Sequence, residues 1–297
     1  RKSDMPGWTA WMETVEPQVI PNSAEVQGIV VQTVDSVRYR YILDHCVATE
    51  IKLLFCGPTG TGKTTYMQQA LASLPKATHM QIQIGFSAQT KCNQFQDLVD
   101  AKLERRRKGV FGPPMGRKCM VMVDDLNMPV KERYGAQPPV EILRQGMDSV
   151  AYGPTGGWYD RKDPTHPFRG IQDVLFFGAM GPPGGGRTHV SPRVLGQFYL
   201  AGFPLLDDEN MALIFNTILD WKFKVDGFPS DVAGLTKKIV SATLEIYKNT
   251  SNELRPTPMK VHYTFNLRDF SKVICGVLLL KKTECEGTDC HVRLWIH

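Results

Sequence analysis

The stretch of this 297-residue sequence that decides the fold is Gly57-Pro58-Thr59-Gly60-Thr61-Gly62-Lys63-Thr64. It matches the phosphate-binding pattern G-x-x-x-x-G-K-[ST] without a mismatch. Glycines in such a loop let backbone N–H groups turn toward a phosphate, the lysine reaches the β- and γ-oxygens, and the Thr64 hydroxyl ligates Mg²⁺. The loop therefore predicts a site for ATP or ADP with Mg²⁺, in which we also expect the neighbouring Thr65.

A phosphate loop requires a strand before it and a helix after it, and the flanking residues have both patterns. The alternative, a chance glycine-rich turn, would not need either. The short apolar run 51–56 predicts a buried parallel strand, and a helix is expected from Lys63 to about Leu74, before Pro75. Alternating patterns continue along the chain, with strands at 79–84, 119–123, 171–179 and within 194–203, and helices at 93–108 and 139–147. This alternation predicts an α/β fold with a doubly wound, parallel, five-stranded sheet.

The strand pattern stops near residue 205. Helical spacing follows at 207–221, 231–247 and 266–281 and predicts a small all-helical domain over 206–297. Residues 1–28 show no sustained period and are expected to form an extended segment, which leaves 29–205 as the nucleotide-binding part. The sequence begins without Met and stops abruptly, so we expect a piece of a longer chain.

Two carboxylates follow the expected strand at 119–123. Asp124 would hold Mg²⁺ together with Thr64, and Asp125 would orient or deprotonate an attacking water. The alternative for both residues is an acidic turn or a helix cap. Asp125 is one methylene shorter than the Glu that is usual at this position in P-loop ATPases, which weakens the prediction of rapid hydrolysis.

Composition and charge are those of an ordinary globular protein. Apolar residues make up 42% and charged residues 22% of the chain, and the net charge of +5 is mild for this length. The basic run 105–108 contains no interleaved aromatic residues and is expected to be a solvated helix end, so no nucleic-acid partner is predicted. No apolar run is long enough to span a bilayer, so no membrane partner is predicted. The seven scattered cysteines predict free thiols inside the cell.

The loop, the two carboxylates, the later strands and the helical end together resemble an AAA+ module. Longer phrases resemble axonemal dynein heavy chains, most closely the third AAA+ module of the motor ring: IGFSAQT at 84–90, VDDLNMP at 123–129, YGAQPP at 134–139 and GWYDRK at 157–162. The resemblance covers nearly the whole chain. It implies an AAA+ fold with a helical lid, and ATP binding that is coupled to ring conformation in ciliary or flagellar movement.

The resemblance also implies partners and a location. The direct partners would be the adjacent AAA+ modules of the same heavy chain. Microtubules and the dynein intermediate and light chains would bind other parts of the full protein. The implied location is the cytoplasm and cytoskeleton, in the axoneme of a cilium or flagellum.

Four further residues take roles from the resemblance. Arg193 matches the arginine finger, which reaches the nucleotide of the neighbouring module, although a surface role is the alternative because Arg187 also lies nearby. Arg268 matches the lid arginine called sensor 2, with a surface ion pair to Asp269 as the alternative.

The other two are valines of the segment that packs against adenine in AAA+ folds. Val31 and Val34 match this segment, and the alternative for both is an ordinary core position. They precede an expected helix through 38–43, for which Asp35 or Ser36 would be the cap.

The sequence departs from the family pattern at three places. Gly181 has no side chain where relatives of the cytoplasmic kind carry a polar sensor residue, residues 149–155 look inserted, and Gly196 stands where a second Arg is common. With Asp125, these departures favour a second hypothesis, a nucleotide-holding regulatory module with little or no hydrolysis. A GTPase would need an Asn-Lys-x-Asp motif, which the sequence lacks, and a small-molecule kinase would not explain the lid arginine.

Overall fold

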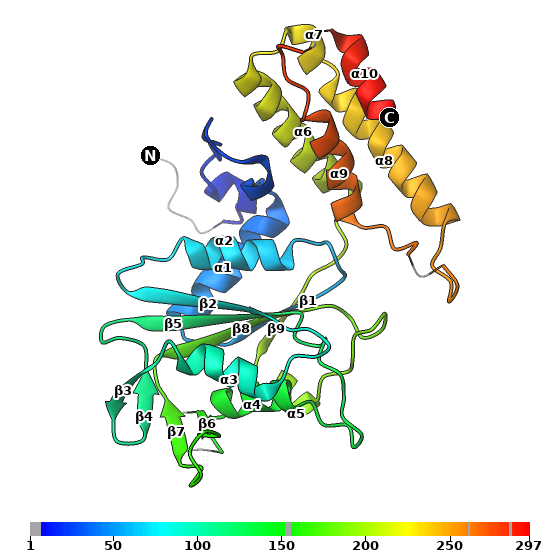
Figure 1. Ribbon diagram of the computed structural model, residues 1–297. Coiled ribbons are helices and arrows are strands. Elements are labelled where there is room, and N and C mark those ends of the chain that lie inside the picture. The colour runs from blue at the N-terminus through cyan, green and yellow to red at the C-terminus, as the bar shows by residue number, and fades with distance from the viewer. Residues whose placement is uncertain (1–6, 152–155, 261, 285–286) are drawn as a thin grey trace. The chain divides into compact units, whose positions relative to one another are not determined.

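The computed structural model describes residues 7–151, 156–260, 262–284 and 287–297 (Figure 1). The chain divides into two compact units, one formed by Arg40–Leu205 and the other by the residues up to Tyr39 together with Leu206–His297. Helix α1, Val34–Ala48, begins in one unit and ends in the other. Each unit has its own cluster of buried apolar side chains.

The centre of the 40–205 unit is a parallel sheet of five strands in the order β2-β5-β8-β1-β9 (Figure 1). The sequence predicts this sheet correctly because its strands are apolar runs buried on both faces, as parallel strands are. The strand bounds are Leu53–Cys56 for β1, His79–Gly85 for β2, Lys118–Asp124 for β5, Val174–Met180 for β8 and Tyr199–Gly202 for β9.

Helices cover both faces of this sheet. Figure 1 shows α2 on one face, with α3 and α4 on the other. Their bounds are Lys63–Ala72 for α2, Cys92–Asp100 for α3, Pro138–Met147 for α4 and Pro192–Leu195 for the single-turn α5. On the α3 side, Phe95 and Trp158 are fully buried with ring centroids 6.1 Å apart, and the Trp158 indole donates a hydrogen bond to Asp100. The layered α/β architecture is therefore the one expected.

A second sheet, in the order β3-β4-β7-β6, was not predicted. The expected helix at 93–108 is wrong beyond Asp100, because 104–107 pairs with the next strand in a hairpin that turns at Gly109, whose φ of 75° favours glycine. The expected strand 171–179 is also two strands, since β7 ends at Ile171 and β8 begins at Val174. The strands of the second sheet are β3 (Glu104–Arg107), β4 (Val110–Gly112), β6 (Gly157–Tyr159) and β7 (Phe168–Ile171).

The residues after Leu205 are helical, as expected. The helices are α6 (Asp208–Asp226), α7 (Ser230–Ala233), α8 (Thr236–Glu253), α9 (Leu267–Val277) and α10 (Thr288–Ile296). Their shared core includes Phe215, Phe223 and Phe270. The expected helix 231–247 is divided into α7 and α8, and α10 was not predicted. The N-terminal segment contains only two short 3-10 turns among its described residues, η1 (Trp11–Thr14) and η2 (Val26–Gly28).

Two smaller expectations, the cap of α1 and the state of the cysteines, are tested by the described residues. The N-cap residue of α1 is Thr33, whose hydroxyl accepts a hydrogen bond from Ser36 N at 3.1 Å, while Ser36 Oγ accepts the Thr33 N–H at 2.8 Å. Ser36 thus takes part in the cap from inside the helix, but neither it nor Asp35 is the N-cap residue itself. Five cysteines are free thiols, whereas Cys290 is disulfide-bonded, contrary to the expectation of free thiols throughout. No helix in the described ranges is both long and apolar enough to cross a membrane. The expected insertion at 149–155 falls partly on residues 152–155, outside the described residues.

Candidate nucleotide site

The phosphate loop joins β1 to α2, and glycine is required at three of its positions. Gly60 and Gly62 have φ angles of 81° and 87°, in the left-handed region. At Gly57, a Cβ atom would lie 2.3 Å from the carbonyl oxygen of Phe203, so only glycine lets the loop pass the end of β9. No side chain caps the N-terminus of α2, and its first backbone amides are left for an anion.

Lys63 is buried in this loop, with 8% of its surface exposed. Its Nζ donates hydrogen bonds to the Pro58 carbonyl and to Thr61 Oγ1, the latter at 3.2 Å. Burial lowers the pKa of Lys63 below that of an ordinary lysine, and the nearby Asp124 opposes this shift. A buried ammonium with only neutral hydrogen-bond acceptors would be stabilised by a phosphate, which is the chemistry that the loop motif implies.

Thr64 and Asp124 come together as a Mg²⁺ site would need. Thr64 Oγ1 lies 3.1 Å from Asp124 Oδ1, which links the start of α2 to the end of β5. The same carboxylate oxygen accepts the backbone N–H of Asp125 at 2.9 Å, and this bond fixes its orientation. Mg²⁺ prefers oxygen ligands and takes few of them from the protein, leaving room for water and phosphate. The donor set therefore fits this ion.

Asp125 lies beside this pair and is half exposed. Its side chain is 47% exposed and its backbone has a φ of 51°. One carboxylate oxygen lies 3.5 Å from Arg187 Nη2. At the adjacent Gly181, an added Cβ would lie 2.7 Å from Arg187 Nε. The Arg187 side chain therefore fills the space that a side chain at position 181 would need.

Sequence reasoning considered Arg187 only as a possible competitor of Arg193 and missed this contact. Two features of the sequence could have pointed to it. Position 181 lacks the polar side chain that the family pattern leads one to expect, and Arg187 follows a run of three glycines. All three, Gly184, Gly185 and Gly186, have positive φ angles, so the chain can turn back toward β8 there.

The two arginines that the sequence predicts for the site, Arg193 and Arg268, are exposed. Arg193 lies in α5, where its backbone N–H bonds to Ser191 Oγ at 3.3 Å, and its side chain forms no ion pair with any described residue. Arg268 is the second residue of α9. The Asp269 carboxylate accepts the backbone N–H of Asn266 and lies 3.6 Å from Lys272, and no ion pair joins it to Arg268 among the described residues.

The remaining predicted residues divide between the two units. Thr65 is exposed on α2, Thr59 is exposed in the loop, and Thr61 is buried, in the same unit as Asp124. Val31 is buried and Val34 is the first residue of α1, both in the unit that contains the lid helices.

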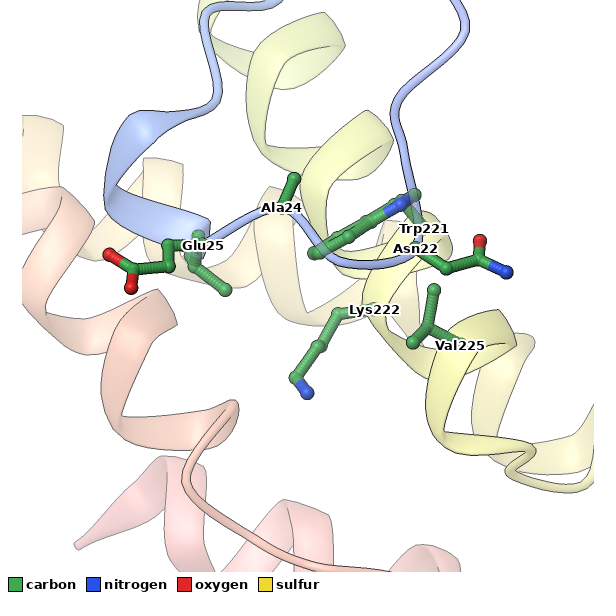
Figure 2. Close-up of a pocket in the computed structure, with 7 residues that line it drawn as sticks. Asn22, Ala24, Glu25, Trp221, Lys222 and Val225 are labelled. Carbon is green, nitrogen blue, oxygen red and sulfur yellow. The ribbon is translucent and has the colours of Figure 1, made fainter.

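A separate pocket lies in the unit that contains the lid helices. Figure 2 shows Asn22, Ala24 and Glu25 of the N-terminal segment around it, with Trp221, Lys222 and Val225 of α6. The Lys222 ammonium is already paired with Asp226 at 2.8 Å. This pocket has no carboxylate pair or phosphate loop, so its chemistry gives a weaker candidate site than the loop at Gly57–Thr64.

The parallel sheet, the phosphate loop and the helical lid define a nucleotide-binding module of the AAA+ class. Residues 18–205 match the family described as "P-loop containing dynein motor region", and residues 239–297 match the "AAA+ lid domain". The chain belongs to the dynein motor family.

Relatives agree with this assignment. The chain is 44% identical to dynein axonemal heavy chain 12 of Rattus norvegicus over 98% of its length, but covers 9% of that protein. It is 45% identical to dynein axonemal heavy chain 3 of Mus musculus and 41% identical to dynein axonemal heavy chain 1 of Homo sapiens, in each case over 98% of this chain and 7% of the relative. It is thus homologous to an AAA+ region of axonemal dynein heavy chains and spans less than a tenth of the length of these relatives.

Proposed function

We propose that this chain binds ATP or ADP with Mg²⁺ at its phosphate loop, as the third AAA+ module of an axonemal dynein motor ring. The observation that carries the proposal is the buried Lys63 ammonium beside the Thr64–Asp124 pair. In the proposed complex, Lys63 contacts the β- and γ-phosphates, and Thr64 and Asp124 hold the ion. Backbone amides of the loop and Thr65 complete the phosphate contacts.

The remaining roles and partners follow from membership of the motor family. Arg193 reaches the nucleotide of the neighbouring module, Arg268 contacts the phosphates from the lid, and Val31 and Val34 pack on the adenine. The direct partners are the adjacent AAA+ modules, while microtubules and dynein intermediate and light chains bind elsewhere on the full protein. The proposed location is the axoneme of a cilium or flagellum.

Nucleotide state would be coupled to ring conformation in this proposal, and hydrolysis by the isolated chain would be slow. Arg193 is exposed, as a finger that serves another module would be, and a finger from a neighbour would be missing at this chain's own site. Asp125, the proposed group for the attacking water, is in contact with Arg187. This contact favours the second candidate function, a regulatory module that holds nucleotide with little turnover.

The test of binding is calorimetric titration of the 297-residue chain with ATP and ADP in the presence of Mg²⁺. Replacing Lys63 with Ala should weaken the binding of ATP and of ADP by about 100-fold or more, because two or more charge-assisted hydrogen bonds of roughly 1.5–3 kcal/mol are lost. Lys52→Ala is the control, since Lys52 is a partly buried lysine of the same unit that bonds to the Met147 carbonyl, outside the loop. Unchanged affinity in Lys63→Ala would contradict the site assignment.

The two candidate functions differ in turnover. A single-turnover measurement of γ-phosphate release in the intact ring distinguishes them, because the neighbour's arginine is then present. Release at a rate comparable to that of a motor step supports the hydrolysing module. Retention of the triphosphate through many motor cycles supports the nucleotide-holding module.

A further inference from the structure

Arg187 has spare hydrogen-bonding capacity at the edge of the nucleotide site. Its contact with Asp125, at 3.5 Å, is at the outer limit for a hydrogen bond. Its Nε is buried, and within the described ranges no acceptor contacts it. A guanidinium carries five N–H donors. Donors that are desolvated and unpaired cost free energy, so the group is arranged for an acceptor that binds later.

The backbone holds Arg187 at this place. Gly184 and Arg187 exchange two backbone hydrogen bonds of 3.0 Å, which close the turn through the glycine run. The next residue, Thr188, donates its N–H to the Asn127 carbonyl at 2.9 Å and so ties the turn to the segment after β5. Asn127 in turn donates its side-chain amide to the Gly181 carbonyl at 2.8 Å. These bonds fix the origin of the Arg187 side chain, which is 20% exposed.

Gly181 lets this side chain reach the site. Any residue with a Cβ at position 181 would contact Arg187 Nε at 2.7 Å and Cδ at 2.9 Å. The guanidinium lies beside Asp125, which directly follows the proposed ion ligand Asp124. A second cation besides Lys63 is thus held at the edge of the site, where the negative charge of a triphosphate would attract it.

We propose that Arg187 contacts the terminal phosphate of a nucleoside triphosphate bound at the loop of its own chain, in the space that Gly181 leaves open. Asp125 holds the guanidinium when no triphosphate is bound. The inference rests on the proposed function, because it requires nucleotide at this loop. A diphosphate lacks the γ-oxygens, so Arg187 would be a specificity residue that favours triphosphate over diphosphate.

The geometry favours this role over a purely structural ion pair. Asp125 is half exposed, and an exposed pair contributes little to stability, typically about 0–1 kcal/mol. A structural arginine would also use its Nε, yet this atom is buried without an acceptor among the described residues. A phosphate presents several oxygens and can accept two N–H groups of one guanidinium at once.

The experiment compares two probes, ATPγS and ADP, each with Mg²⁺, by calorimetric titration of the 297-residue chain. Arg187→Ala should weaken ATPγS binding by about 10- to 100-fold, the usual effect of losing a charge-assisted hydrogen bond. ADP binding should stay within about twofold of wild type on the same basis, since the lost contact is to the γ-phosphate. The affinity of Arg187→Lys for ATPγS should lie between those of wild type and Arg187→Ala, because lysine keeps the charge but not the planar pair of donors. Arg161→Ala, an exposed arginine of the same unit, is the control and should change neither affinity.

Gly181→Ala gives a second, independent variant. The atoms that its Cβ would meet belong to the flexible Arg187 side chain, so the fold can accept the methyl by moving the guanidinium away. This variant should also weaken ATPγS selectively. Adding Arg187→Ala to it should cause little further loss, because both changes remove the same contact.

The outcomes separate the two proposals. If the wild-type chain binds neither probe, the proposed function and this inference fall together. If wild type binds both probes and Arg187→Ala changes the two affinities equally, or changes neither, only this inference is overturned. Circular dichroism checks that each variant is folded. Should Arg187→Ala fail to fold, Gly181→Ala decides by the same criterion, since it keeps Arg187 in the chain.

Discussion

The two sides of the candidate nucleotide site are built in different ways. On the phosphate-loop side, Gly57 packs against backbone, and the buried Lys63 bonds to its own loop. On the terminal-phosphate side, Asp125 is half exposed, and its contact with Arg187 is 3.5 Å long. Packed backbone has one geometry, whereas a long contact between partly exposed side chains can exchange partners. The fold therefore fixes the shape of the phosphate loop, while any response to the γ-phosphate depends on side chains that can move.

Adding a methyl group to a glycine on each side of the site tests this comparison, and the largest expected loss of stability is at Gly57. Gly57→Ala places a Cβ 2.3 Å from the carbonyl oxygen of Phe203, which is backbone and cannot turn away. The end of β9 must then shift, and we expect a loss of about 1–3 kcal/mol in the free energy of unfolding, as for other overpacked sites. Urea denaturation of the chain measures this loss.

Gly181→Ala is the matched variant for this measurement. Its Cβ meets the Arg187 side chain instead of backbone, so the loss should be below about 0.5 kcal/mol, as for most changes away from packed backbone. Equal losses in the two variants would show that the phosphate-loop side is no more rigid than the other side.

The same contrast separates what the sequence could predict from what it could not. The central sheet follows from local pattern, because β5 and β8 are apolar runs whose burial can be read from their residues alone. The hairpin of β3 and β4 does not, since its arginine-rich strand also fits the end of a helix. What makes it a strand is pairing with β4 and, through β4, with β7, which lies far along the sequence at Phe168–Ile171.

The site divides along the same line. Lys63, Thr64 and Asp124 carry their chemistry within motifs whose spacing is diagnostic, and the structure brings Thr64 within 3.1 Å of Asp124. The contact of Arg187 with Asp125 is a product of tertiary structure. It depends on the positive φ angles of a glycine turn and on the missing side chain of Gly181, neither of which leaves a periodic signal.

A smaller effect is expected from Asp124→Asn. This change keeps the shape of the side chain but removes the negative charge that would face Mg²⁺, so affinity for ATP in the presence of Mg²⁺ should fall by roughly tenfold, on the order of one charged interaction. With EDTA in place of Mg²⁺, variant and wild type should bind ATP alike in calorimetric titration. Asp97→Asn, on the surface beside Lys162, is the control. A loss that persists in EDTA would mean that Asp124 contributes to the fold of the loop and not to an ion site.

The smallest expected effect is that of Arg193→Ala, and it tests whether the two neighbouring arginines work on the same nucleotide. Arg193 is exposed, and the Ser191 hydroxyl bonds to its backbone N–H, which the substitution keeps. The free energy of unfolding should therefore change by less than about 0.5 kcal/mol, as at other exposed positions. Because the proposed role of Arg193 is at a neighbour's site, the affinity of the isolated chain for ATPγS should stay within about twofold of wild type. A tenfold loss there would place Arg193 at its own chain's nucleotide and would remove the contrast with Arg187, since both guanidiniums would then serve one phosphate.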